Sequence, residues 1–170
     1  MESLSIDGDY KIIVIDSLTS KKSSDGNCDF YIDLDEPLRN VYKLKIIANL
    51  INIKPGSSIN SNLESIYIDL NNYTRLISKY ASDDITKTNN IYYFDSLIVE
   101  NSSVGTNQTI KNDYNNADIE YSLNPIEPQI YRFKIQLFNK NNVLLNFNND
   151  VNRFIMKLGV YYNNKKTTRL

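Results

Sequence analysis

Residues 130–162 read IYRFKIQLFNKNNVLLNFNNDVNRFIMKLGVYY and alternate in polarity at both ends. In a strand, such alternation places apolar and polar side chains on opposite sides. The apolar set of the first part is Tyr131, Phe133, Ile135 and Leu137, and that of the last part is Phe154, Met156, Leu158, Val160 and Tyr162. The asparagine-rich segment 139–142 predicts a turn between them. We therefore expect two strands, each buried on one side, and no helix.

Six further segments have the short, β-branched or alternating pattern of strands. They are residues 10–15, 30–34, 41–53, 65–70, 91–99 and 119–123. Pro37 is expected to end the second strand, because proline lacks the amide hydrogen of a ladder. Pro125 and Pro128 predict a bend before residue 130. In residues 41–53 the expected shared face is Tyr42, Leu44, Ile46, Ala48 and Leu50.

Four other segments depart from this pattern. Tyr73, Leu76, Ile77 and Tyr80 have helical spacing, with Asn71 or Asn72 as an N-cap, and predict one short helix. Residues 16–27, 83–90 and 100–117 are polar and predict loops, the last a long surface loop. The pattern favours an all-β fold, an eight-stranded antiparallel jelly-roll sandwich with one short helix. We expect one domain over residues 1–170, with extended termini at 1–9 and 163–170.

The composition is that of a globular protein. The chain has 170 residues, 41% of them apolar, which is the size of one domain with one core. No run approaches the length of a membrane span, and the N-terminus lacks the pattern of a secretory signal. The net charge of −1 gives no general attraction to nucleic acid; only the basic tail, residues 165–169, offers a local patch, and a solvated terminus is the simpler interpretation. The single cysteine, Cys28, is expected to be a buried thiol.

The sequence assigns no catalytic residue, no cofactor-binding residue and no metal ligand. It has no histidine, and therefore lacks the usual base of a catalytic triad and the commonest transition-metal ligand. It also has no G-x-S-x-G elbow and no phosphate-binding glycine loop. Acidic pairs or groups occur at Asp7/Asp9, Asp33/Asp35/Glu36 and Asp83/Asp84; we interpret them as solvated surfaces. Sequons at Asn72, Asn101 and Asn107 matter only in a secretory route.

Two stretches resemble small virion proteins of giant DNA viruses and of related virophage and polinton-like viruses. The first comprises residues 10–17 and 29–44, and the second residues 128–147, which is similar to an R-x-x-I-x-L-x-D-x-N-G-x-x-x-x-F pattern. Here Asn141-Asn142 replaces the Asn-Gly turn, and Leu18-Thr19-Ser20 replaces the arginines that often follow the Asp-Ser pair.

The resemblance implies a single jelly roll that acts as a minor capsid or penton-type protein. Its partners would then be major capsid protein, other minor capsid proteins and copies of itself, in virions assembled in the host cytoplasm. It implies no small-molecule substrate. Loops 16–27 and 100–117 and the two termini would carry the contacts.

Two other functions stay open. Thirteen tyrosines offer faces that stack on sugar rings, so a lectin-like module of a virion spike is the main alternative; however, Tyr42, Tyr93 and Tyr131 occupy positions expected to face the core. An enzyme with paired carboxylates ranks last.

Overall fold

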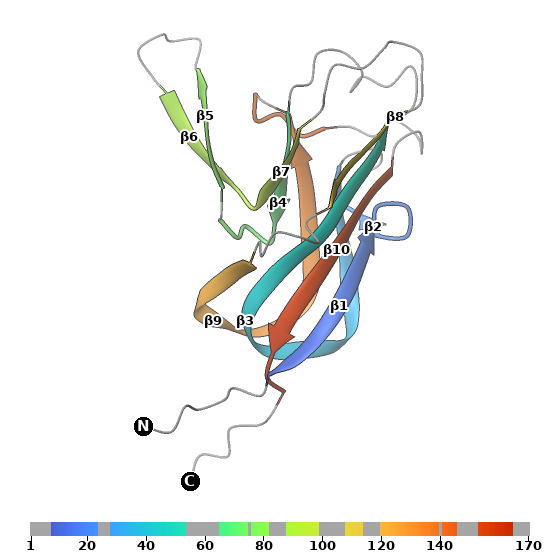
Figure 1. The fold of residues 1–170 in the computed structure, drawn as a ribbon, viewed down its shortest axis with the longest axis vertical. Coiled ribbons are helices and arrows are strands. Elements are labelled where there is room, and N and C mark those ends of the chain that lie inside the picture. Colours follow the sequence, from blue (N-terminus) through green and yellow to red (C-terminus); the bar gives the residue numbers. More distant parts are fainter. Residues whose placement is uncertain are drawn as a thin grey trace.

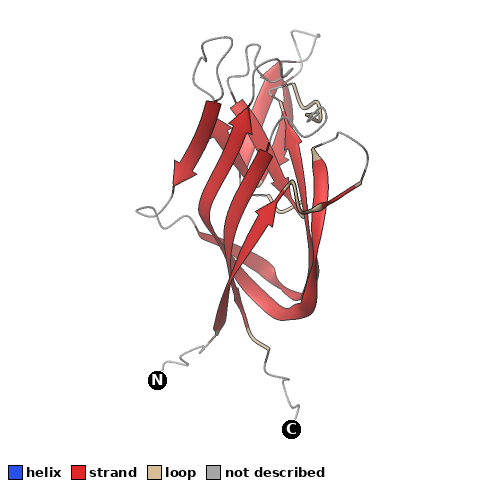
Figure 2. Ribbon diagram, turned by 90° about the vertical axis from the view of Figure 1, so that its right-hand side faces the viewer, coloured by secondary structure: helices blue, strands red, loops and turns tan. Residues whose placement is uncertain are grey.

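A computed structural model of the chain describes residues 8–23, 28–53, 65–74, 76–81, 88–98, 108–113, 120–139, 141–145 and 153–164. Among these residues, all regular secondary structure is β-strand (Figure 2). The strands are β1 (Asp9–Asp16), β2 (Lys21–Lys22), β3 (Asp29–Ile53), β4 (Ser65–Leu70), β5 (Leu76–Ala81), β6 (Thr88–Tyr93), β7 (Asp95–Ile98), β8 (Gln108–Asp113), β9 (Glu120–Phe138) and β10 (Arg153–Tyr162). None of the described residues forms a helix that is able to cross a membrane.

Eight of the strands form one antiparallel sheet, in the order β1-β10-β3-β9-β4-β7, with β2 and β8 also paired to β3. The sheet curls, so that β1, β10 and the second half of β3 lie opposite β9, β4 and β7 (Figure 1). β5 and β6 form a separate pair beside β4. The prediction of an antiparallel all-β chain is confirmed, and its main sheet has eight strands, although they are not the eight that were predicted.

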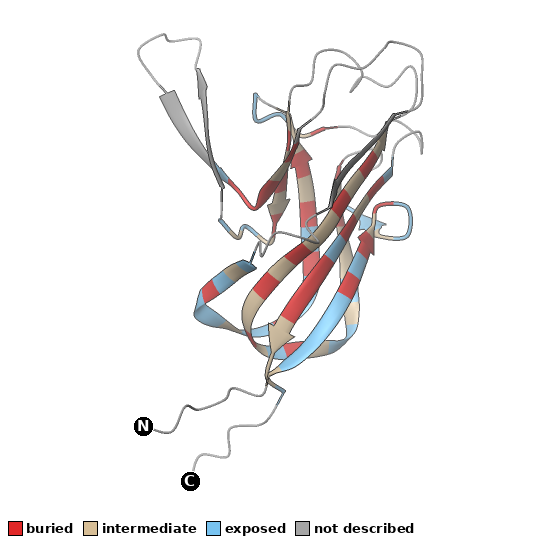
Figure 3. Cartoon of the chain, viewed as in Figure 1, coloured by how far each residue is buried: buried red, intermediate tan, exposed pale blue. Residues whose placement is uncertain are grey.

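The core fills the inside of this curl. Its largest fully buried side chains include Phe30, Phe94, Phe133 and Phe154. The rings of Phe30 and Phe154 lie 6.0 Å apart between centroids, joining β10 to the first half of β3. Cys28 is fully buried, as expected. Burial therefore follows the alternation predicted for β4 and β10 and for most of β9 (Figure 3).

The prediction that Pro37 ends a strand is wrong, because β3 runs through it without interruption. The ladder between β3 and β9 skips from Asp33 to Leu38, so Pro37 lies where no ladder hydrogen bond is needed. A second skip follows between Val41 and Lys43, next to Asn40, whose φ is 49°. These irregularities let one strand bend and pair in both halves of the curl.

The predicted shared face of residues 41–53 is also wrong beyond Ile46. The ladder with β10 pairs Leu158 with Ile46 and Lys157 with Ala48, which leaves Ile47 as an extra residue. Such a β-bulge turns every later side chain to the other face. Asn49 and Ile51 are therefore buried, while Ala48 and Leu50 are half-buried.

No helix forms where one was predicted. Leu76–Ala81 is β5, paired along its whole length with β6. Asn71 and Asn72 have φ values of 51° and 60°, so they form a turn and cap no helix. The helical spacing of four apolar residues was a weak signal, because so short a helix gains less from its own hydrogen bonds than a strand gains from a paired neighbour.

Three other boundaries differ from the prediction. The single strand expected at residues 91–99 is divided at Phe94 between β6 and β7, which belong to different sheets. β9 runs without interruption through the predicted bend, although its ladder skips from Ser122 to Glu127 there. The bend is confirmed, but the prediction of two separate strands on either side of it is wrong. The loops expected at 16–27, 83–90 and 100–117 contain β2, the start of β6 and β8. The other residues of the loop at 100–117 lie outside the described part of the chain.

The connection after β9 agrees with the sequence. Asn139 accepts hydrogen bonds on its side-chain oxygen from the amides of Asn141 and Val143, both at 2.9 Å, which forms the predicted turn. After β10, Asn163 donates its backbone N–H to Arg39 O at 3.0 Å, so this residue of the expected extended terminus is bound to β3.

Candidate functional site

A groove lies along β9, next to the turn that follows β4. It has a volume of about 330 Å³ and is lined by Asn71, Asn72, Tyr73, Glu127, Gln129, Ile130, Tyr131, Arg132 and Lys134. We call it the β9 groove. Its lining combines tyrosine rings, amides and charged groups, and Tyr131 is 63% exposed. The prediction that Tyr131 faces the core is wrong, because the alternation of β9 is interrupted at the register skip opposite Asp33 and Leu38.

The turn after β4 forms one wall of the groove and is fixed to β9 by Asn71. The Asn71 side chain donates to Arg132 O at 3.1 Å and accepts from the Lys134 amide at 2.7 Å. Its own backbone N–H donates to Lys134 O at 3.0 Å. Asparagine suits this position because it tolerates positive φ and carries both a donor and an acceptor.

Tyr73 lies at the base of this wall. Its hydroxyl donates to Glu127 at 3.5 Å, and its ring lies 6.1 Å from that of Tyr121. Burial raises the pKa of Tyr73 to about 12. The phenol therefore stays protonated at neutral pH and acts as a hydrogen-bond donor.

The cations of the groove are already paired with carboxylates of β3. Arg132 Nε lies 2.7 Å from Asp33, and its guanidinium covers the Tyr31 ring at 4.0 Å. Lys21 contacts the other oxygen of Asp33 at 2.7 Å. Lys134 Nζ lies 3.3 Å from Asp29. Arg132 first, and then Lys21, hold the pKa of Asp33 below its ordinary value.

We expect Arg132→Gln to raise the pKa of Asp33 toward its ordinary value, and Lys21→Gln to raise it less. Because the folded-state pKa is depressed, the stabilisation from this carboxylate is present above the ordinary pKa and is lost as pH falls through the folded value. Carboxyl-detected NMR titration measures the change. Arg39→Gln is the control and should leave Asp33 unaffected; equal titration of Asp33 in all three variants would contradict the assignment.

A second hollow, of about 300 Å³, lies next to the β9 groove and shares Asn72 with it. It is lined by Asp69, Asn72, Thr74, Tyr92, Tyr93, Gln136, Phe138 and Asn142. The Tyr93 ring stacks on Tyr67 at 4.6 Å, and its hydroxyl donates to Asn142 at 2.8 Å. Desolvation raises the pKa of Asp69.

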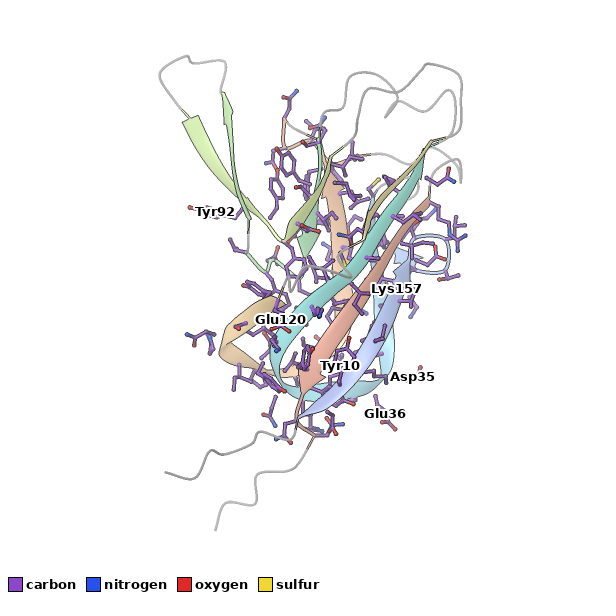
Figure 4. The ribbon with its side chains drawn as sticks, in the orientation of Figure 1. Tyr10, Asp35, Glu36, Tyr92, Glu120 and Lys157 are labelled. Atoms are coloured by element: carbon purple, nitrogen blue, oxygen red, sulfur yellow. The ribbon has the colours of Figure 1, made fainter. Side chains whose placement is uncertain are left out.

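A different surface is the edge of the main sheet formed by β1. Tyr10, Ile12 and Val14 project from one face of this strand and are 46%, 53% and 53% exposed. Tyr10 lies 4.7 Å from the Tyr161 ring, over Gly159, where a Cβ would approach the Tyr10 hydroxyl oxygen to 2.5 Å. Tyr10 and Lys157 lie over β1 and β10 in Figure 4. β1 thus combines an exposed apolar face with a position at the sheet edge, which favours contacts between chains.

The acidic groups identified in the sequence do not gather into one site among the described residues. Asp33 forms the ion pairs described above, whereas Asp35 and Glu36 are exposed (Figure 4). Asp9 is exposed at the start of β1. In the described ranges, no three cysteine or acidic side chains lie together as metal ligands are arranged. Asp7, Asp83, Asp84 and the basic tail at 165–169 lie outside the described residues.

Sequence reasoning missed the role of Asn71 and placed Tyr131 on the wrong side. The Asn71-Asn72 pair was the available signal, since consecutive asparagines favour a turn with positive φ. Of the other tyrosines expected to face the core, Tyr93 is buried and Tyr42 is half-buried. Asn72, the asparagine of the first sequon, is exposed; Asn101 and Asn107 lie outside the described residues.

Comparison with known proteins gives little. No protein-family model matches the sequence, and no curated protein matches it. Among solved structures, the chain is similar to one from "Crystal structure of the T13 IBDV viral particle reveals a missing link in icosahedral viruses evolution", with 11% identity and a TM-score of 0.31. The match covers 92% of this chain and 32% of the other, so this chain spans about a third of the length of that one. A TM-score of this size does not establish a common fold.

Proposed function

We propose that this chain is a structural virion component, a minor capsid or penton-type protein that contacts major capsid protein, and that its curled sheet is a single jelly roll. The observation that carries the proposal is the apolar edge strand β1. An edge strand presents unpaired backbone groups, and natural proteins usually protect it with charges or bulges. β1 instead exposes Tyr10, Ile12 and Val14 in a row.

Two further points support the proposal. The stretches that resemble small virion proteins fall on β1, on the first half of β3 and on β9, all of which belong to the main sheet. A shell is built by repeated contacts between copies and neighbours, and such contacts need apolar patches with polar rims. On β1, Asp16 follows Val14 on the same face and ends the apolar row with a charged side chain.

The proposal is tested in purified particles of the virus that encodes the chain, after washing with nuclease and protease. We expect the chain at a fixed ratio to major capsid protein, measured by quantitative mass spectrometry. Its absence from such particles would overturn the proposal. The isolated chain should turn over no substrate.

The edge strand is tested by the double variant Ile12→Lys, Val14→Lys. Both side chains are exposed, so the variant should fold, but two charges on an edge strand oppose pairing with another chain. We expect its incorporation into particles to fall by about tenfold, the effect of losing roughly 1.4 kcal/mol of contact energy. Val143→Lys, in an exposed turn, is the matched control. Unchanged incorporation of the double variant would place the contact elsewhere on the molecule.

A further inference from the structure

We propose that the β9 groove binds a neutral oligosaccharide, with the ring of Tyr131 as the surface on which a sugar stacks. This inference does not depend on the virion proposal, because a chain that is absent from particles would still bind a glycan through the same groove.

Tyr131 provides the stacking surface. It is 63% exposed, more than any other large apolar or aromatic side chain of the described core and surface, and it lines the groove. An exposed tyrosine offers a rigid apolar face and a polar tip. The axial hydrogens of a pyranose ring form a matching apolar face, so the ring buries area on Tyr131 while its hydroxyl groups stay polar.

Amides and a phenol surround this ring with hydrogen-bonding groups. In the described part of the chain, no residue forms a hydrogen bond with the side chains of Asn72 or Gln129, and both line the groove. Each amide offers both a donor and an acceptor, as a sugar hydroxyl requires. The Tyr73 hydroxyl donates its hydrogen to Glu127, and its oxygen can accept a hydrogen bond from a sugar hydroxyl.

The charge balance selects a neutral ligand. Arg132 is paired with Asp33 and Lys134 with Asp29, so neither cation is left to neutralise a phosphate, sulfate or sialic acid carboxylate. Glu127 adds a negative charge within the groove. Nucleic-acid binding depends on unneutralised basic groups along the strand, which favours a neutral sugar over a polyanion here.

Preorganisation and size fit a short oligosaccharide. Asn71 fixes the wall of the groove to β9 through three hydrogen bonds, so little order has to be gained on binding. The volume of about 330 Å³ lies at the lower end of small-ligand sites. The second hollow continues beyond Asn72 and gives room for a further sugar unit.

The test uses the full chain on an array of neutral, sialylated and sulfated oligosaccharides, followed by calorimetric titration of the strongest neutral ligand. We expect saturable binding of a neutral glycan that persists in EDTA, because Glu127 is the single carboxylate among the residues of the groove. Tyr131→Ala should weaken binding about tenfold, whereas Tyr131→Phe keeps the ring and should stay within about threefold.

Tyr10→Ala is the matched control, since Tyr10 is an exposed tyrosine outside the groove. Thermal unfolding of each variant shows that it is folded before its affinity is compared. The proposal is overturned if no neutral glycan binds saturably, if binding needs calcium, if a sulfated glycan or single-stranded nucleic acid binds more tightly, or if Tyr131→Ala binds as the native chain does.

Discussion

Phe154→Ala should lower the free energy of unfolding by about 3–5 kcal/mol, the usual cost of truncating a buried phenylalanine. Phe154 is fully buried, and its ring packs 6.0 Å from that of Phe30. The contact joins β10 to the half of β3 that lies on the opposite side of the bend. Removing the ring therefore leaves a cavity inside the curl and separates its two sides. Urea denaturation followed by circular dichroism measures the change.

Val143→Ala is the control for this variant, because Val143 is 57% exposed in the turn after β9. Its effect should stay within about 0.5 kcal/mol, as for most surface substitutions. Phe154→Leu should fall between the two, since leucine refills part of the cavity. A loss below about 1 kcal/mol for Phe154→Ala would show that the curl is not held by this packing.

Asn49→Asp should destabilise the chain by about 3 kcal/mol or more at neutral pH, because it places two carboxyl groups together in the core. Asn49 Nδ2 donates to Asp95 Oδ2 at 2.6 Å, and both residues are buried. This hydrogen bond joins the second half of β3 to the start of β7. The substitution replaces the donor with an oxygen that repels Asp95 unless one of the two carboxyl groups is protonated.

The pH dependence distinguishes this mechanism from a simple loss of packing. A buried pair of carboxyl groups holds its proton to higher pH than a free carboxyl does. The penalty should therefore grow as pH rises above about 4, the ordinary range of aspartate, and shrink as pH falls toward it. Urea denaturation from pH 4 to pH 8 measures it. Asn141→Asp, in an exposed turn, is the control; a penalty that does not vary with pH would contradict the shared proton.

Alternation predicted a strand well wherever one face of that strand packs against the core along its whole length. β4 shows this, since Ile66, Ile68 and Leu70 are buried and the residues between them are not. The same holds for β10 from Phe154 to Leu158. In both, burial depends on the strand's own pleat, which the local sequence records.

Prediction failed where the outcome depended on a partner strand. Leu76 and Ile77 have the spacing of a helix, but β6 offers a full ladder of hydrogen bonds to the chain there. Ile47 has no local feature that marks it as an extra residue; the register of β10 makes it one. The candidate groove was missed for the same reason, because Tyr131 leaves the inner face only where β3 and β9 skip register.

The sequence by itself determined that the chain is built from antiparallel strands, where most of them lie, and which side chains of β4 and β10 enter the core, because a pleat of period two is a local property. Tertiary structure decided that β3 continues through Pro37, that β5 is a strand, that β1 lies at an edge, and that Asn71, Tyr73 and Tyr131 meet in one groove. Each of these depends on register between segments far apart in the chain, and hydrogen bonds across a sheet, not the order of residues along a strand, fix that register.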